Sequence, residues 1–246
     1  MDRLVAMGCE GALGGWVTAE CVGESAAASS SWRTSVSLCA SIGDVADRHG
    51  DSNAIVAMAV PMGLLDSVDF RACDRQAREV LGERRVCVWA PPSRPLLTAS
   101  TYTEARLRVA ELRKTRPDAK GLAAQQFALA PRIKEADDWL QDHPGAQEWL
   151  HEVHPELAFC EMAGHPVEEK KRSPAGQHAR RRLVEHAFHD ARAVIDSTSF
   201  LAKEARLPDI LNAYAVLHAA LRVASGKHEQ LGGDRDGLGL IMRMVF

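Results

Sequence analysis

The chain has 246 residues and a formal net charge of -3, and 46% of its residues are hydrophobic. This length suffices for one large domain or two small ones. The slightly acidic balance argues against an obligate nucleic-acid-coating protein, which is commonly basic, but not against an enzyme that contacts a few phosphates. The longest apolar run, residues 55–65, is too short to span a bilayer, so we expect no membrane association.

The predicted elements alternate between strands and helices after an all-strand start. In the first part of the chain we predict strands at residues 4–9, 15–22 and 34–40, a helix at 42–49, and strands at 54–60 and 86–89 around a helix at 73–84. Helices follow at 102–114 and 122–140, the second of them kinked or broken at Pro131. The last predicted elements are a strand at 153–162, helices at 179–191 and 207–224, and a strand within 238–246. Residues 24–31 are predicted to form a small-residue turn. This order predicts an α/β fold in which helices cover both faces of a mixed sheet.

The cysteines indicate the cellular compartment. None of the six forms a Cys-x-x-Cys pair, so a zinc knuckle or a thioredoxin-type site is not supported. The charged residues Asp2, Arg3 and Glu10 interrupt any secretory signal at the start of the chain. We therefore expect reduced thiols and a cytoplasmic location.

The first two predicted strands are joined by a glycine-rich turn. Gly11, Gly14 and Gly15 are expected to supply the positive φ angles that a tight hairpin requires. Glu10 lies at the end of the first strand, at the mouth of this turn. The sequence thus places a carboxylate beside a backbone turn.

Six segments, taken in order, resemble the bacterial domain-of-unknown-function family 429, whose members are described as predicted RNase H-like nucleases. The segments are Glu10-Gly11-x-x-Gly14-Gly15-Trp16, Val60-Pro61-Met62-Gly63-Leu64, Arg71-x-Cys73-Asp74-Arg75-x-Ala77-Arg78, Gln125-Gln126-Phe127 with Pro131-Arg132-Ile133-Lys134-Glu135-x-Asp137, Glu152-Val153-His154-Pro155-Glu156-Leu157-x-Phe159, and Asp209-Ile210-Leu211-Asn212-Ala213. Each match alone is weak, but the six together cover most of the chain. The resemblance implies a single RNase H-like domain over residues 1–246.

The chain departs from the family pattern where the resemblance implies metal-binding aspartates. The first hairpin carries Glu10 in place of the family's Asp, and Ala59 stands before the Val-Pro of the fourth strand. In the last helix Pro208 and Asn212 replace two of three aspartates, which leaves Asp209. The resemblance implies Mg²⁺ or Mn²⁺ held by Glu10, Asp209 and Asn212, but this ligand set is reduced.

RNase H-type hydrolysis commonly uses two divalent cations about 4 Å apart, each held by oxygen ligands. Ala59 cannot ligate a metal, and Asn212 offers one neutral oxygen. Glu10 reaches one methylene further than Asp, which would move a metal by about an ångström and lower the rate. Two-metal catalysis is therefore not expected, although one weakly held Mg²⁺ remains compatible with Glu10 and Asp209.

A second group of polar residues falls in the better-preserved segments. On the predicted strand His154 and Glu156 point to the same side, and on the predicted helix Lys134 and Asp137 share a face. The predicted catalytic residues of this polar group are His154, Glu156, Lys134, Glu135 and Asp137. The alternative is a structural salt-bridge network that fixes helix to strand.

Several residues are candidates for contacting a phosphate-bearing substrate. These substrate-binding candidates are Arg71, Asp74, Arg75, Gln126, Lys170 and Lys171. The basic segment that contains Lys170, Lys171 and residues 180–182 is also typical of a solvated loop and helix face.

Three functional hypotheses follow. The first is a divalent-metal-dependent phosphodiester hydrolase with an altered site. The second is a catalytically silent member, a pseudoenzyme, that binds nucleic acid, a nucleotide or a partner protein. The third is a member redirected to another small-molecule reaction through His154, Glu156 and Lys134. The nuclease prediction rests on analogy, because a fold does not determine a function, and the sequence does not indicate the oligomeric state.

Overall fold

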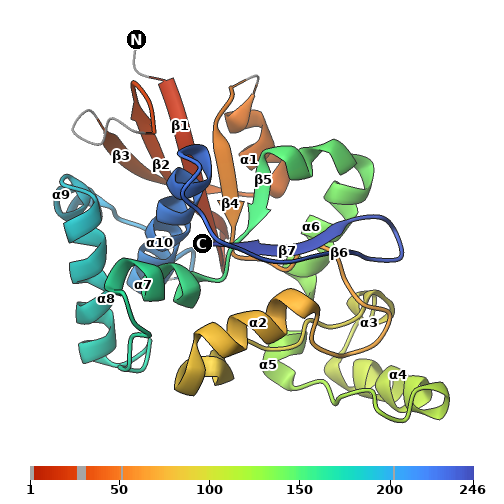
Figure 1. Cartoon of the computed structure of the whole chain (residues 1–246). Coiled ribbons are helices and arrows are strands. Elements are labelled where there is room, and N and C mark those ends of the chain that lie inside the picture. The colour runs from red at the N-terminus through yellow and green to blue at the C-terminus, as the bar shows by residue number, and fades with distance from the viewer. Residues whose placement is uncertain (1–2, 27–31, 51, 202) are drawn as a thin grey trace.

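The sheet at the centre of the molecule has five strands in the order β3-β2-β1-β4-β5 (Figure 1). A computed structural model describes residues 3–26, 32–50, 52–201 and 203–246. The strands are β1 (Arg3–Ala12), β2 (Gly15–Gly23), β3 (Arg33–Cys39), β4 (Ile55–Met58) and β5 (Leu150–Glu152). The first three form an antiparallel meander, and β4 and β5 run parallel to β1. The predicted α/β fold with a mixed sheet is confirmed.

Helices cover both faces of this sheet. One face packs against α7 (Pro155–Ala163), α8 (Pro174–Ala187), α9 (Ala191–Ser197) and α10 (Leu207–Ala224), and the other packs against α1 (Ile42–His49), α6 (Ala130–Asp142) and the 3-10 helix η3 (Pro144–Glu148). Alternation along β1 produces this division, since Ala6 belongs to the α10 core while Met7 and Cys9 belong to the α6 core.

The segment between β4 and α6 lies beyond the carboxyl end of β4 (Figure 1). It contains α2 (Ala72–Val80), the 3-10 helix η2 (Gly82–Cys87), α3 (Arg94–Leu97), α4 (Tyr102–Thr115) and α5 (Ala124–Phe127). A hairpin of β6 (Gln230–Arg235) and β7 (Ile241–Val245) packs against α2 through Cys73, Leu231 and Met244.

Helix α10 lies directly against β1 at Gly8. A Cβ atom on Gly8 would lie 2.0 Å from the backbone nitrogen of Leu217 and 2.4 Å from the carbonyl oxygen of Ala213. Only glycine permits this approach of helix to strand. Glu10 follows Gly8 by two residues, so its side chain points to the same face as α10.

The prediction of a strand at residues 153–162 is wrong, because β5 ends at Glu152 and α7 follows. Pro155 occupies the first helical turn, and the backbone N–H of Glu156 donates to Nδ1 of His154, which caps the helix. A short, fully buried apolar run cannot be assigned to strand or helix by periodicity alone.

Other differences are smaller. Residues 86–89 form the end of η2 and a coil, and the helix predicted at 122–140 is divided into α5 and α6 before Pro131. Of the three turn glycines only Gly15 has a positive φ, of 142°. Residues 27–31 of the predicted turn lie outside the described residues.

All six cysteines are free. No helix among the described residues combines the length and apolarity needed to cross a bilayer.

Candidate functional site

Three of the predicted residues meet near the end of β1. The amide Nδ2 of Asn212, on the first turns of α10, donates to Oε1 of Glu10 at 2.8 Å. The ammonium Nζ of Lys171 lies 3.8 Å from the same oxygen. With Asp209 these residues form what we call the Glu10 group (Glu10, Lys171, Asp209 and Asn212).

Burial raises the pKa of Glu10 to about 7, although the nearby Lys171 and the hydrogen bond from Asn212 act in the opposite direction. The charge of Asp209 adds to the increase, and Asp209 lies on α10, the helix that covers the face of the sheet toward which Glu10 points. Oδ2 of Asp209 also accepts the backbone N–H of Arg206 at 2.9 Å and caps the first turn of α10. One carboxylate of the group thus titrates near neutral pH, and the other is partly committed to its helix.

The donor set of the Glu10 group does not fit a two-metal centre. Ala59, at the exit of β4, provides no ligand atom, and the described residues contain no group of three His, Cys, Asp or Glu side chains arranged for a metal ion. Oε1 of Glu10 already faces an amide donor and an ammonium group. Oδ1 of Asn212 is buried without a hydrogen-bond partner, which leaves one oxygen to accept from a ligand.

A buried ion pair between Arg180 and Glu156 anchors the loop that carries Lys171. The guanidinium of Arg180, on α8, donates to both carboxylate oxygens of Glu156, at 2.7 and 3.2 Å. Its Nη1 also donates to the carbonyl oxygens of Glu169 and Gly176, which flank Lys171 in sequence. Arg180 is 1% exposed, so the interpretation of residues 180–182 as a wholly solvated face is wrong at this position.

His154 and Glu156 make local contacts at the start of α7. Nε2 of His154 faces the carbonyl oxygen of Cys87 at 3.4 Å, while Nδ1 accepts the N-cap hydrogen bond of α7. Burial lowers the pKa of His154, with Glu156 acting against this effect, so the imidazole is neutral at neutral pH. The charge of Lys171 also lowers this pKa.

A second buried network surrounds Arg71. Its guanidinium donates to Glu152 at 2.5 and 2.8 Å, to both carboxylate oxygens of Asp74, and to the carbonyl oxygens of Met62 and Gly63. Glu152 in turn accepts the backbone N–H of Met62 at 2.7 Å. Arg71 therefore joins the ends of β4 and β5 to α2. Its donors are already used, so it has none left to hold a phosphate.

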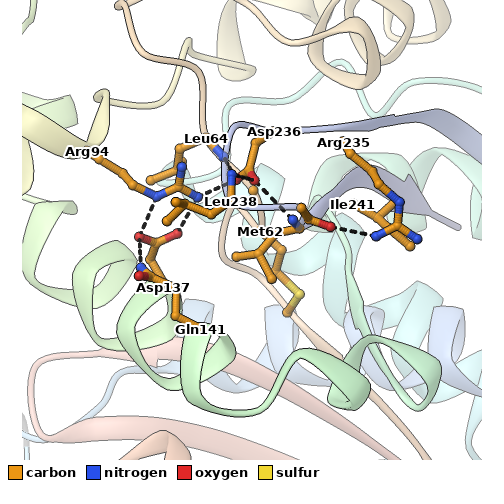
Figure 2. A network of polar contacts seen from close by, with 12 residues as sticks. Met62, Leu64, Arg94, Asp137, Gln141, Arg235, Asp236, Leu238 and Ile241 are labelled. Carbon is orange, nitrogen blue, oxygen red and sulfur yellow. Dashed lines mark hydrogen bonds and ion pairs between the residues drawn. The ribbon is translucent and has the colours of Figure 1, made fainter.

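Asp137 belongs to a third network, which Figure 2 shows. Arg94 donates to both oxygens of Asp137, at 2.8 and 2.9 Å, and forms an ion pair with Asp236. Asp236 accepts the backbone N–H of Leu64 and Leu238. This network ties α6 to α3 and to the loop between β6 and β7, away from His154.

The remaining predicted site residues are dispersed. Lys134 forms an exposed ion pair with Asp138, and Glu135 accepts from the indole of Trp16 and the backbone N–H of Ile42. The other three predicted residues are placed as follows: Arg75 pairs with Asp69, Gln126 caps α5 and donates to Ala90, and Lys170 is exposed. The structure does not bring Lys134, Glu135 and Asp137 together with His154, so the third hypothesis has no common cleft to support it.

Arg180 and Glu152 are structurally important residues that we did not single out from the sequence. Glu152 and Glu156 flank His154 with even spacing, but nothing in this local pattern shows that each pairs with a different arginine. Their partners are 81 and 24 residues away, which no local pattern reveals.

No curated protein and no solved structure matches the chain significantly. A family model described as protein of unknown function (DUF429) matches residues 2–237, nearly the whole chain, and the protein belongs to this family.

Proposed function

We propose that the chain binds a phosphate ester, a nucleotide or a nucleic-acid backbone, at the Glu10 group, and that it does so without two-metal hydrolysis. The observation that carries this proposal is the presence of Lys171 and Asn212 on the carboxylate of Glu10, where the family resemblance implies a cation. An ammonium group and an amide are suited to an anionic ligand, whereas three converging carboxylates would be suited to Mg²⁺.

Three further features support an anionic ligand. The first turns of α10, an 18-residue helix, carry Asp209 and Asn212, and the N-terminus of a long helix favours negative charge. Lys171 is 38% exposed, so its ammonium can leave Glu10 and reach a ligand. A pKa of about 7 means that Glu10 is partly neutral at physiological pH, which reduces its repulsion of a phosphate.

Binding of a short single-stranded oligonucleotide should test the proposal, with isothermal titration calorimetry at low salt as the measurement. We expect Lys171→Ala to weaken binding roughly tenfold, because it removes the one ammonium group at the site. Arg172→Ala is the matched control: it removes an exposed positive charge from the same loop, and we expect a change of less than about twofold.

A phosphodiester has no ionisation near neutral pH, so the pH dependence of its binding reports on the protein. Affinity is expected to rise as the pH falls from 8 to 6, since protonation of Glu10 removes a negative charge beside the ligand. In Glu10→Gln this dependence should disappear. If Lys171→Ala and Arg172→Ala weaken oligonucleotide binding equally, the binding is non-specific charge attraction and the proposed site is contradicted.

The competing hypothesis of a metal-dependent hydrolase makes the opposite prediction. Cleavage of the oligonucleotide in the presence of Mn²⁺, lost in Glu10→Gln and Asp209→Asn, would replace our proposal with the hydrolase.

A further inference from the structure

A groove of about 510 Å³ lies between the end of α1, the end of α6 and η3. It is lined by Asp47, His49, Trp139, His143 and Trp149, among others. Trp149 immediately precedes β5, and its carbonyl oxygen accepts the backbone N–H of Val56 on β4. The groove therefore lies at the amino ends of the parallel strands β4 and β5, whereas the Glu10 group lies near the carboxyl end of β1. The proposed phosphate site does not use it.

Four aromatic rings line this groove in a fixed arrangement. His49 stacks on Trp149 with a centroid separation of 4.0 Å, and His143 stacks on Trp139 at 4.3 Å. The two indoles meet edge to face, 6.1 Å apart and at 74°. The chain has 5 tryptophans, and two of them line this one groove.

Hydrogen bonds fix both imidazoles. Nε2 of His49 lies 3.0 Å from the carbonyl oxygen of Ala54, and Nδ1 of His143 lies 2.9 Å from that of Trp139, so each ring donates an N–H to the backbone. His49 is 8% exposed. The aromatic walls are thus formed before any ligand arrives, which lowers the entropic cost of binding.

The charges around the groove are negative and unpaired. Asp47, Asp142 and Glu148, from the three elements that surround it, make no hydrogen bond or ion pair through their side chains within the described ranges. No lysine or arginine lines the groove, and the neighbouring Arg48 is engaged with Glu20 at 2.6 Å. Electron-rich ring faces beside uncompensated carboxylates attract a cation.

We infer that this groove binds an organic cation with an alkylated ammonium head, which packs against the aromatic wall that contains Trp139 and Trp149 and which the carboxylate of Asp47 attracts. An alkylated ammonium loses little hydration on entering an aromatic site, and its methyl groups fill apolar volume that a bare ammonium would leave empty. The volume of the groove lies within the range of small-molecule sites, so it accommodates a cation that carries further substituents.

Choline and its uncharged isostere 3,3-dimethyl-1-butanol separate charge recognition from apolar packing. In calorimetric titrations of the full chain, we expect choline to bind with roughly millimolar affinity and at least about tenfold more tightly than the isostere. Tryptophan fluorescence should change with the same midpoint. Equal affinity for the two probes, or no saturable signal with choline up to about 100 mM, would overturn the inference.

Substitutions localise the site. Asp47→Asn should weaken choline binding by about threefold to tenfold, while Asp118→Asn, which removes an exposed acid far from the groove, should leave it unchanged. Trp149→Ala risks unfolding the adjacent core, so His143→Ala, at an exposed position, provides the second variant. We expect it to change the fluorescence response and weaken binding with little change in melting temperature. Unchanged choline affinity in both Asp47→Asn and His143→Ala would place binding elsewhere and contradict the inference.

Discussion

The Glu10 group and the Arg180 network lie next to each other, yet they differ in how completely their polar atoms are paired. Arg180 donates to a carboxylate and two carbonyl groups. In the Glu10 group, by contrast, Oδ1 of Asn212 is buried without a partner, and the pKa of Glu10 is raised to about 7. A fully paired network stabilises a fold, whereas an incompletely paired one retains the capacity to bind.

The largest expected effect is on the Arg180 network. Glu156→Ala leaves a buried guanidinium without its only bidentate carboxylate and should lower the free energy of unfolding by about 3–5 kcal/mol, as measured by urea denaturation. It should also weaken phosphate binding, because the loop that carries Lys171 loses its anchor. A loss of less than 1 kcal/mol would remove the distinction between the two regions.

A smaller loss is expected at the Arg71 network. Glu152→Ala should cost about 2–4 kcal/mol in the same assay, because Asp74 remains as a carboxylate partner for Arg71. The test is which of the two variants loses more unfolding free energy. If Glu152→Ala loses more than Glu156→Ala, Asp74 does not compensate for the missing carboxylate.

The pH dependence of the unfolding free energy tests the part of this comparison that concerns the Glu10 group. The pKa of Glu10 is about 7 in the folded state against an ordinary value of 4.5, so its contribution to stability is fully present below pH 4.5 and is lost as the pH rises through 7. Relative to Glu10→Gln, the wild-type chain should therefore lose about 2–3 kcal/mol of unfolding free energy between pH 5 and pH 9. Glu111→Gln, at an exposed position on α4, is the control and should retain the wild-type pH profile. Parallel profiles for the wild type and Glu10→Gln would show that this carboxyl titrates normally.

The smallest effect is expected at Lys134. Its ion pair with Asp138 is exposed on α6, and Lys134→Ala should change the unfolding free energy by less than about 0.5 kcal/mol. Phosphate binding should also be unchanged. Weaker phosphate binding in this variant would show that Lys134 contributes to the functional site.

The sequence was sufficient for elements whose signals are local. The helix predicted at 42–49, with Gly50 as its end, has the observed bounds of α1, and the structure adds a capping box of Ser41 and Asp44 at its start. The helix at 207–224 was equally clear, since its length and apolar composition match a helix buried within the core.

The function of polar residues was much less predictable. Glu152 and Glu156 were visible, but the sequence contains 33 acidic residues and 30 lysines and arginines, and no local pattern matches one carboxylate to Arg71 and another to Arg180. Only tertiary packing decides these pairs. The resemblance implies that Glu10 and Asn212 lie together as metal ligands, whereas Lys171 is a candidate substrate contact only from the basic segment, and nothing in the sequence predicts that it lies beside Glu10.

The contact at Gly8 has a consequence for how substitutions act in the Glu10 group. Backbone meets backbone there, so the spacing between β1 and α10 does not depend on the side chains at positions 10, 59 and 212. Such a frame tolerates exchange of those side chains without rearrangement. Aspartates introduced at these three positions would therefore enter an unchanged scaffold, so this part of the molecule can change its chemistry through point substitutions alone.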